Sequence, residues 1–581
     1  MDLKKLIRDG KNDDAALLKR LREVDFFVLD NSLRETTVGA VRGHTLEDKK
    51  AIIRALSKTN LTEMVLGSFG ASDNVDDLAA HWLNNSQWQH KLESMWGFSE
   101  LYDMDPLTKL PSMQPPYGLV EMATVHNMSN AIIEIDTCNP KIDYSKIDLI
   151  KILRNQLEYV DKNFRKRSND KLKPRVLVNL RDFTDYETHP DGFERALQLV
   201  EMMAEMHATH GANCPFGLML EEPTGFLLPE TISKNVRTIR KVMGKWPGKL
   251  LLHTHMNFGL AQAGILQAIG AGVDGIWGAV CRTGAHLGHA CSAVTLLNLA
   301  RLGNTWVRER YNIPEIVKAA RAVHEIVVGS PPNALEEVYG INAFDVAFHG
   351  WHGFMQGEMD AAAAFAGVTN PTIRIGDFAG AAMIEQAMVS RFGSAKVGKW
   401  DPALCVKMEK TIDNELLRGT CYDFNTIIGL AQLYEFSGGH LTPAMLRAMD
   451  LATKDSAPDL HPLLVELKRR WWAKASGKPT SGGVVDIWQS SWMAKTDPPK
   501  LSLDVFLDDI LQAKQGVLMQ KNRADFKRML DVDHDGSVSW AEFEFRVKWG
   551  MSQRGLLFHP TPEALMLDAF GGVMKELRDA G

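Results

Sequence analysis

Two histidines separated by one residue, His253 and His255, end an apolar run that begins at Lys249. The run predicts a buried β-strand, and side chains at positions i and i+2 of a strand point to the same face. Both imidazoles should therefore face one point, and neutral imidazole is a common ligand of divalent metals. For an isolated motif of this kind, the alternative of a hydrogen-bonded histidine pair at a strand end is favoured.

The segments that follow this motif favour a site. A helical stretch rich in alanine and leucine, Ala261–Ala271, leads to a second apolar strand, Gly272–Val280. A loop with glycines and histidines comes next and contains Cys281, His286 and His289. A strand, a helix, a second strand and such a loop are the elements from which an α/β barrel builds a site at the carboxyl ends of its strands.

Short β-type runs alternate with helical stretches from about residue 25 to residue 300. About eight such units in this length predict an α/β fold, a (β/α)8 TIM barrel. A doubly wound sheet is the second choice, because no Gly-x-Gly-x-x-Gly follows the first strand. The predicted strands are Phe26–Leu29, Met64–Phe69, Ala131–Asp136, Arg175–Leu180, Gly217–Leu220, Lys249–His255 and Gly272–Val280, with one more between residues 95 and 125, at Leu119–Val125.

The chain as a whole is expected to contain four parts. Residues 20–305 should form the catalytic barrel domain, and residues 306–470 a mostly helical post-barrel subdomain. Residues 471–500 include a patch of glycine, serine and proline and are expected to be a linker. Residues 501–581 should form a separate helical EF-hand domain.

Composition limits the classes of function. With 581 residues the chain exceeds one ordinary domain, and its formal net charge of −6 argues against a nucleic-acid-binding surface. Scattered cysteines without a Cys-x-x-Cys fit a reducing compartment. No apolar run reaches membrane-spanning length, and the N-terminus lacks an apolar signal core. We therefore expect a protein of the cytoplasm or of an organelle matrix that binds neither nucleic acid nor membranes.

Residues 531–542 match the twelve-residue calcium loop of an EF-hand at every diagnostic position. Gly536 allows the sharp turn at loop position 6. The oxygen ligands of Ca2+ would come from Asp531, Asp533, Asp535, Ser537, Ser539 and Glu542. No second intact loop is visible in the sequence, so the partner hand is degenerate, supplied by another subunit or absent.

The segment Leu29–Thr36 reads Leu-Asp-Asn-Ser-Leu-Arg-Glu-Thr and closes the first predicted strand. Together with the two-histidine motif and the loop to His289, it resembles the DRE-TIM metallolyases. This is the metal-dependent barrel family of 2-isopropylmalate synthase, homocitrate synthase and hydroxymethylglutaryl-CoA lyase. Beyond the barrel, Gly340–Phe344 and Gly350–His352 are similar to the Gly-x-Asn-Ala-Phe and Gly-Ile-His segments of the synthases, and the resemblance covers about residues 25 to 390.

The resemblance implies roles for individual residues. Arg34 matches the family's arginine, which stabilises developing enolate charge. The implied metal ligands are Glu35, His253, His255 and His289. Glutamate stands where the family has aspartate, and the last histidine stands where it has asparagine. A set so rich in nitrogen favours a transition metal, Mn, Fe, Co or Zn, over Mg.

Two further residues would take part in catalysis. His352 is the first candidate for moving a proton, and His349 is the second. Cys281 stands in a place comparable to a loop cysteine of the lyase, with a small buried residue at a strand end as the alternative. The family's glutamate near the second strand has no counterpart in register here, because Met64–Phe69 contains no acid.

The implied function is a Claisen-type condensation of an acyl-CoA with a 2-oxo acid by a divalent-metal-dependent acyltransferase. Cleavage of a carbon–carbon bond by a lyase or an aldolase is the first alternative. A non-catalytic, calcium-responsive binding protein on a degenerate barrel is the second. The family implies a homodimer, and the EF-hand predicts that Ca2+ tunes activity or assembly.

Overall fold

The computed structural model describes residues 15–34, 42–70, 74–107, 110–166, 173–181, 189–210, 215–345, 361–368, 373–376, 379–393, 400–417, 427–442, 445, 448, 461–475, 497–510, 523–531 and 535–544. The chain divides into two compact units. The first comprises residues 1–344 and 357–369, and the second comprises residues 345–356 and 370–581. None of the helices in the described ranges combines the length and the apolar character needed to span a bilayer.

Eight parallel strands form a closed barrel in the first unit, in sequence order around the ring. They are β1 Phe27–Asp30, β2 Met64–Ser68, β3 Met95–Glu100, β4 Asn130–Asp136, β5 Arg175–Arg181, β6 Gly217–Glu222, β7 Lys249–Thr254 and β8 Gly275–Gly278. The ring closes where β1 pairs with β8, with Leu29 opposite Trp277. The predicted (β/α)8 TIM barrel is confirmed.

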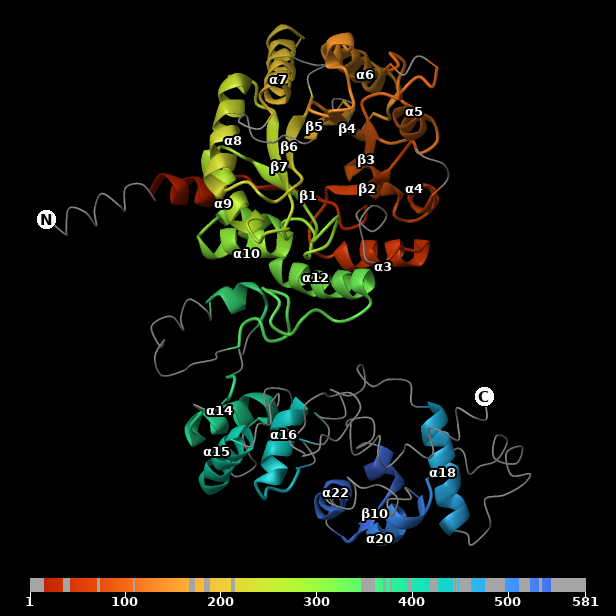
Figure 1. The fold of residues 1–581 in the computed structure, drawn as a ribbon, viewed down its shortest axis with the longest axis vertical. Coiled ribbons are helices and arrows are strands. Elements are labelled where there is room, and N and C mark those ends of the chain that lie inside the picture. The colour runs from red at the N-terminus through yellow and green to blue at the C-terminus, as the bar shows by residue number, and fades with distance from the viewer. Residues whose placement is uncertain are drawn as a thin grey trace, which may run out of the picture. The chain divides into compact units, whose positions relative to one another are not determined.

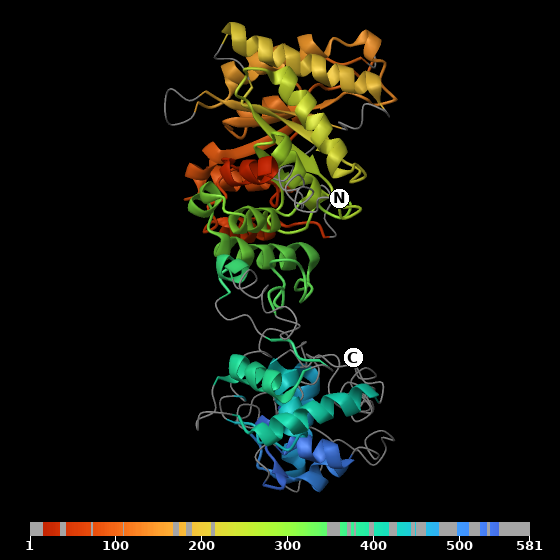
Figure 2. The same ribbon diagram turned by 90° about the vertical axis from the view of Figure 1, so that its left-hand side faces the viewer.

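Helices lie outside the ring of strands, as the two ribbon views show (Figures 1 and 2). They are α3 Leu46–Leu56, α4 Val75–Asn84, α5 Tyr117–Thr124, α6 Leu149–Asn163, α7 Pro190–His210, α8 Pro229–Met243, α9 Ala261–Ala271, α10 Ser292–Arg301, α11 Thr305–Arg310 and α12 Ile313–Val328, with 3-10 turns at Gln89–Ser94 and Tyr144–Lys146. Helix α8 shows why such a segment packs against the strands as a helix. Its apolar residues Ile232, Val236 and Ile239 recur at helical spacing and are buried on one face.

One predicted strand was wrong. The strand expected between residues 95 and 125 is Met95–Glu100, whereas the residues Leu119–Val125 belong mostly to helix α5. Leu119 and Met122 are three residues apart and both are buried, which is the spacing of a helix face. A short apolar run fits a buried strand and a buried helix equally well, and here the sequence period is that of the helix.

Side chains that face into the barrel alternate along the strands. The apolar ones pack into a separate interior cluster of Phe27, Leu29, Val65, Trp96, Phe98, Ile132, Leu177, Met219, Leu251 and Trp277. Two residues beyond the last apolar member of a strand, the same face carries a polar side chain. These polar residues are Glu100 on β3, Glu134 on β4, Asn179 on β5, Glu221 on β6 and His253 on β7.

The second unit is mostly helical. Its elements are α14 Ala381–Phe392, α15 Pro402–Leu417, α16 Ile427–Phe436, α18 His461–Ala475, α20 Leu503–Val505, a π-helical turn Phe506–Ile510, α22 Arg523–Leu530, and the strands β9 Leu501–Ser502 and β10 Ser537–Val538. Trp471 is fully buried, and its ring centre lies 4.6 Å from that of Phe506 and 5.6 Å from that of Trp540. The first residues of the predicted linker 471–500 therefore belong to a helix and to a packed core.

Candidate functional site

Three buried histidines meet at the carboxyl end of the barrel. His253 lies near the end of β7, His255 follows that strand, and His289 lies in the loop after β8. Their ring centres are 4.4 to 5.1 Å apart. One ligand atom from each lies within 4.8 Å of the other two, so one metal ion can contact all three. The two histidines of the motif face one point, as their i and i+2 positions require.

The surroundings of His253 indicate whether the three histidines suit a metal ion. His253 is buried against the ring of Trp277, with ring centres 5.0 Å apart. Neither ring nitrogen has a hydrogen-bond partner among the described residues, and Nδ1 lies 3.6 Å from Glu221 Oε2. Burial, followed by the neighbouring His289 and His255, lowers the pKa of His253 well below its usual value, so the ring is neutral. A buried nitrogen without a partner is costly. A divalent cation that accepts its lone pair would remove that cost.

The other two histidines are oriented by their second ring nitrogen. The Nδ1 of His255 lies 3.3 Å from the carbonyl oxygen of Ala285, to which it can donate a proton. The Nδ1 of His289 lies 2.9 Å from the Asn31 amide, whose buried Oδ1 has no partner within the described ranges. A half-turn of this amide brings Oδ1 to the ring and makes it an acceptor for Nδ1–H. In both rings, Nε2 is then available to a metal, as in many metal sites of proteins.

Replacing Asn31 with alanine is expected to weaken binding of a barrel metal by about 10–100-fold, the usual effect of losing a residue that orients a ligand. Titration of the metal-free protein with Zn2+ or Co2+ measures this. Asn163 is the control, because it lies on α6, where its amide donates only to the Tyr159 carbonyl at 2.8 Å. An unchanged dissociation constant in Asn31→Ala would contradict the orienting role.

Other predicted site residues fall in different places. Glu35 and His352, together with His349, lie outside the described residues, so their roles stay predictions. Cys281 is fully buried, its Sγ is 3.7 Å from the Thr283 hydroxyl, and it does not line the cavity. Burial raises the pKa of its thiol well above the usual value. This placement favours the small buried residue that the sequence left as the alternative.

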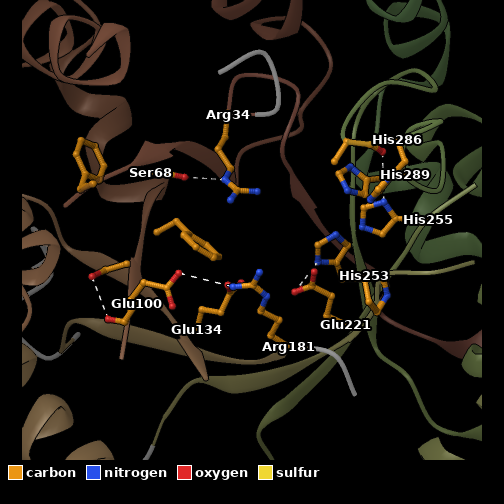
Figure 3. Close-up of a pocket in the computed structure, with 15 residues that line it drawn as sticks. Arg34, Ser68, Glu100, Glu134, Arg181, Glu221, His253, His255, His286 and His289 are labelled. Atoms are coloured by element: carbon orange, nitrogen blue, oxygen red, sulfur yellow. Dashed lines mark hydrogen bonds and ion pairs between the residues drawn. The ribbon is translucent and has the colours of Figure 1, made fainter. Parts of the chain in front are cut away.

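Arg34 lies at the wall of a cavity of about 550 Å3 that the three histidines also line (Figure 3). Its Nε donates to the Ser68 hydroxyl at 2.9 Å. Its guanidinium carbon lies 4.3 Å from the ring centre of Phe98 and 5.2 Å from that of Trp277. Contact with two aromatic faces holds the cation beside the space that a substrate would occupy.

A buried ion pair fixes the loop that carries this arginine. The Lys49 ammonium lies 2.7 Å from Asp76 Oδ1 and donates to the Leu33 carbonyl at 2.7 Å. The other oxygen of Asp76 accepts from the Ser68 backbone N–H at 2.9 Å. Neither charged side chain is exposed to solvent. The ion pair thus joins the loop after β1 to the end of β2, which are the two segments that hold the guanidinium.

The sequence suggested no acid in register on β2, and the structure shows what replaces it. Ser68 makes the contact with Arg34, and Asp76 from helix α4 holds Ser68 from behind. A side chain at Gly67 would place its Cβ 2.4 Å from the Asp76 Cβ, so only glycine permits this approach. An acid, Asp76, therefore lies next to Ser68, the residue that contacts Arg34.

Three glutamates that the sequence pattern did not single out, Glu100, Glu134 and Glu221, also line the cavity, and Glu221 Oε2 lies 3.6 Å from His253 Nδ1. The Glu134 carboxylate accepts from Arg181 at 2.9 Å and from the Asn179 amide at 2.9 Å, and the same amide donates to Glu221 at 2.7 Å. Burial, followed by the charges of Glu221 and Glu100, raises the pKa of Glu134 to about 8. Strand alternation was the available signal, because each acid stands two residues after an inward apolar residue.

The predicted calcium loop contains a hydrogen-bonded turn in its described residues, in the second unit. The two Asp531 carboxylate oxygens accept from the backbone N–H groups of Asp535 and Gly536, both at 3.0 Å. Gly536 has φ +82°, a conformation that favours glycine. The Glu542 carboxylate accepts from Ser539 N at 2.8 Å. Asp533 lies outside the described residues.

A strand of the same chain pairs with this loop. In the antiparallel sheet of β9 and β10, Ser537 lies opposite Ser502 and Val538 opposite Leu501. Just before β9, the Lys500 ammonium lies 2.6 Å from Asp535 Oδ2. Of the three alternatives for the partner hand, this pairing favours a degenerate hand in the same chain.

Comparisons with known proteins find likeness of structure only. The sequence matches no protein-family model and no curated protein. Among solved structures, the HMG-CoA lyase of Bacillus subtilis is 15% identical, with 54% of this chain and 96% of that chain covered and a TM-score of 0.38. The HMG-CoA lyase of Brucella melitensis is 13% identical, with 53% and 99% covered and a TM-score of 0.40.

A third similar structure is the carboxyl transferase domain of pyruvate carboxylase from Rhizobium etli. It is 14% identical, with 96% of this chain and 80% of that chain covered and a TM-score of 0.34. At these identities the likeness is one of fold alone. The chain's own strand order assigns that fold, because eight parallel strands close on themselves between outer helices, as in a (β/α)8 barrel.

Proposed function

We propose that the protein is a divalent-metal-dependent enzyme that joins the enolate of an acyl-CoA to a 2-oxo acid. One observation carries the proposal: three buried histidines converge at the carboxyl end of the barrel, beside Arg34 and on the same cavity. In this fold the carboxyl ends of the strands are the site of catalysis. The likeness of Leu29–Thr36 to the metallolyase motif supports the same chemistry.

His253, His255, His289 and, by the resemblance, Glu35 would hold the metal. A bound divalent cation supplies a Lewis acid that polarises the carbonyl of the 2-oxo acid. Arg34 would donate to the oxygen on which negative charge develops. The apolar floor of Phe98 and Trp277 excludes water beneath these groups, which strengthens their electrostatic effect.

Cleavage of a carbon–carbon bond is the second candidate, because the same groups serve both directions of a Claisen reaction. The sequence offered one separate argument for cleavage, the loop cysteine Cys281. However, this residue is buried in the core and does not line the cavity. We therefore place condensation first.

The test incubates the full-length protein with acetyl-CoA and a panel of 2-oxo acids and follows the appearance of free thiol. CoA release with one acceptor, lost after chelation and restored by Mn2+, Co2+ or Zn2+, is the expected result. No release with any acceptor under any of these metals would overturn the condensation. Cleavage of a hydroxyacyl-CoA in the same preparation would establish the second candidate instead.

We also propose that residues 531–542 bind Ca2+ and that this tunes activity or assembly. The turn at Gly536 and the pairing of β10 with β9 support the proposal. Elemental analysis of protein purified without added metal separates the alternatives. Calcium without a barrel metal would indicate the non-catalytic, calcium-responsive binding protein.

Changing Glu542 to glutamine is expected to weaken Ca2+ binding by about tenfold or more, which corresponds to at least about 1.4 kcal/mol, since the twelfth position of such a loop offers both carboxylate oxygens. Calorimetric titration of the full chain with Ca2+ measures the effect. Glu544→Gln removes the same charge two residues beyond the loop and is the matched control. Equal affinity in both variants would contradict the predicted loop.

A further inference from the structure

The cavity at the barrel mouth has two chemically different sides. Figure 3 shows Arg34 above the open space and the three histidines at its side, with Glu100 and Glu134 below it and Glu221 beside His253, whose Nδ1 lies 3.6 Å from Glu221 Oε2. We call these three glutamates the acidic wall. The first side suits an anionic head group, because it combines a metal site with a guanidinium. The acidic wall has the opposite preference.

In the part of the chain that the structure describes, Arg181 and Asn179 donate hydrogen bonds to the acidic wall. Glu134, whose side chain is 8% exposed, receives one bond from Arg181 and one from Asn179, and the same Asn179 amide donates to Glu221. Glu100 lies 3.9 Å from Arg181, and its side chain is 58% exposed. The buried Oδ1 of Asn179 has no hydrogen-bond partner among the described residues. Carboxylates and this amide oxygen are acceptors, so the wall is rich in acceptors.

Like charges at this wall are costly. Burial and the two neighbouring carboxylates raise the pKa of Glu134 to about 8, although Arg181 and Arg34 act in the other direction. A ligand that brings a positive charge or an additional donor would offset this repulsion. A ligand with a carboxylate at the same place would oppose the ionisation of Glu134 further and increase the repulsion.

We propose that the substrate is a 2-oxo acid whose far end carries a hydrogen-bond donor, an ammonium group first and a hydroxyl second, and that Glu134 and Glu100 recognise it. The inference rests on the proposed function, because it assumes that the 2-oxo acid head lies at the histidines and Arg34. The cavity volume of about 550 Å3 is within the usual range for small-molecule sites. Glu134 and Glu100 are then specificity-determining residues.

Stable mimics of 2-oxo acids test this inference without knowledge of the reaction. Four N-substituted oxamates share one chelating head and differ in the tail: aminoethyl, hydroxyethyl, propyl and carboxymethyl. Calorimetry with the metal-loaded full chain measures each dissociation constant. We expect the aminoethyl compound to bind about tenfold tighter than the propyl compound and about 100-fold tighter than the carboxymethyl compound, the range of one or two charged contacts.

Two variants test whether the acidic wall causes the preference for the aminoethyl tail. Glu134→Gln keeps the shape and removes the ionisable group, and in titrations above pH 8, where Glu134 is ionised, it should reduce the ratio between aminoethyl and carboxymethyl binding by about tenfold. Glu100→Gln, at the more exposed edge, should reduce it less and serves if the first variant does not fold. Glu158→Gln is the matched control, since that residue lies exposed on α6 and pairs with Lys162 at 3.4 Å.

The outcomes separate the inference from the proposed function. Carboxymethyl binding as tight as aminoethyl binding would overturn the inference and leave the proposed function standing. A preference that neither wall variant changes would also overturn it. Failure of all four oxamates to bind would overturn the 2-oxo acid head, and with it both proposals.

Discussion

Replacing His253 with alanine is expected to remove the barrel metal. The variant loses one of three imidazoles that converge within 4.8 Å of one another. Its affinity for Zn2+ or Co2+ should therefore fall by more than the roughly 10–100-fold that loss of an orienting residue costs. Elemental analysis after dialysis measures the metal content. We expect about one metal per chain in the unaltered protein, in addition to Ca2+, and a small fraction of that in the variant.

Thermal unfolding provides a second measurement of the same change. A ligand that binds only the folded chain stabilises it by about 4 kcal/mol at 1,000 times its dissociation constant. With Ca2+ kept in excess over the chelator, chelation should therefore lower the melting temperature of the unaltered protein and leave that of His253→Ala almost unchanged. His90→Ala, which removes an exposed histidine near Trp88, is the control. A variant that keeps its metal would contradict the three-histidine site.

Replacing Lys49 with methionine is expected to destabilise the barrel by about 3–5 kcal/mol, the usual cost of removing one partner of a buried ion pair. The reason is that the Asp76 carboxylate would lose its cation at a place where neither side chain of the pair is exposed. The Leu33 carbonyl would also lose its donor. Urea unfolding, followed by a probe specific to the barrel, measures the change in the free energy of unfolding.

The double variant Lys49→Met with Asp76→Asn should recover part of this loss, because the amide is neutral and can still accept from Ser68 N. Lys50→Met is the matched control at the neighbouring position. Its ammonium pairs with Glu47, which is 73% exposed, and such a pair contributes only about 0–1 kcal/mol. Equal losses in Lys49→Met and Lys50→Met would contradict the role of the buried pair.

The barrel could be predicted because its strands follow local rules. Apolar runs such as Lys249–Thr254 and Asn130–Asp136 are buried on both faces and bounded by polar residues, so their positions can be read from the chain within a few residues. The fold class then follows from the alternation of strands and helices. The exception, Leu119–Val125, shows the limit of this reasoning, because a short buried run fits either element.

The site could be predicted only where its residues are close in sequence. His253 and His255 share one strand end, so their common direction follows from strand geometry alone. The amide of Asn31 and the ring of His289 are 258 positions apart and meet only because β1 and β8 close the ring. No local pattern in the sequence encodes that contact.

The sequence by itself determined the barrel, the direction of the two histidines and the ligand pattern of the calcium loop, because each depends on neighbours within about one element. Tertiary structure decided which distant groups surround them. It placed the acidic wall on the same cavity as the three histidines, put Asp76 behind Ser68, and buried Cys281. The physical reason is that closing eight parallel strands brings their carboxyl ends together, whereas sequence spacing determines only the direction of each side chain.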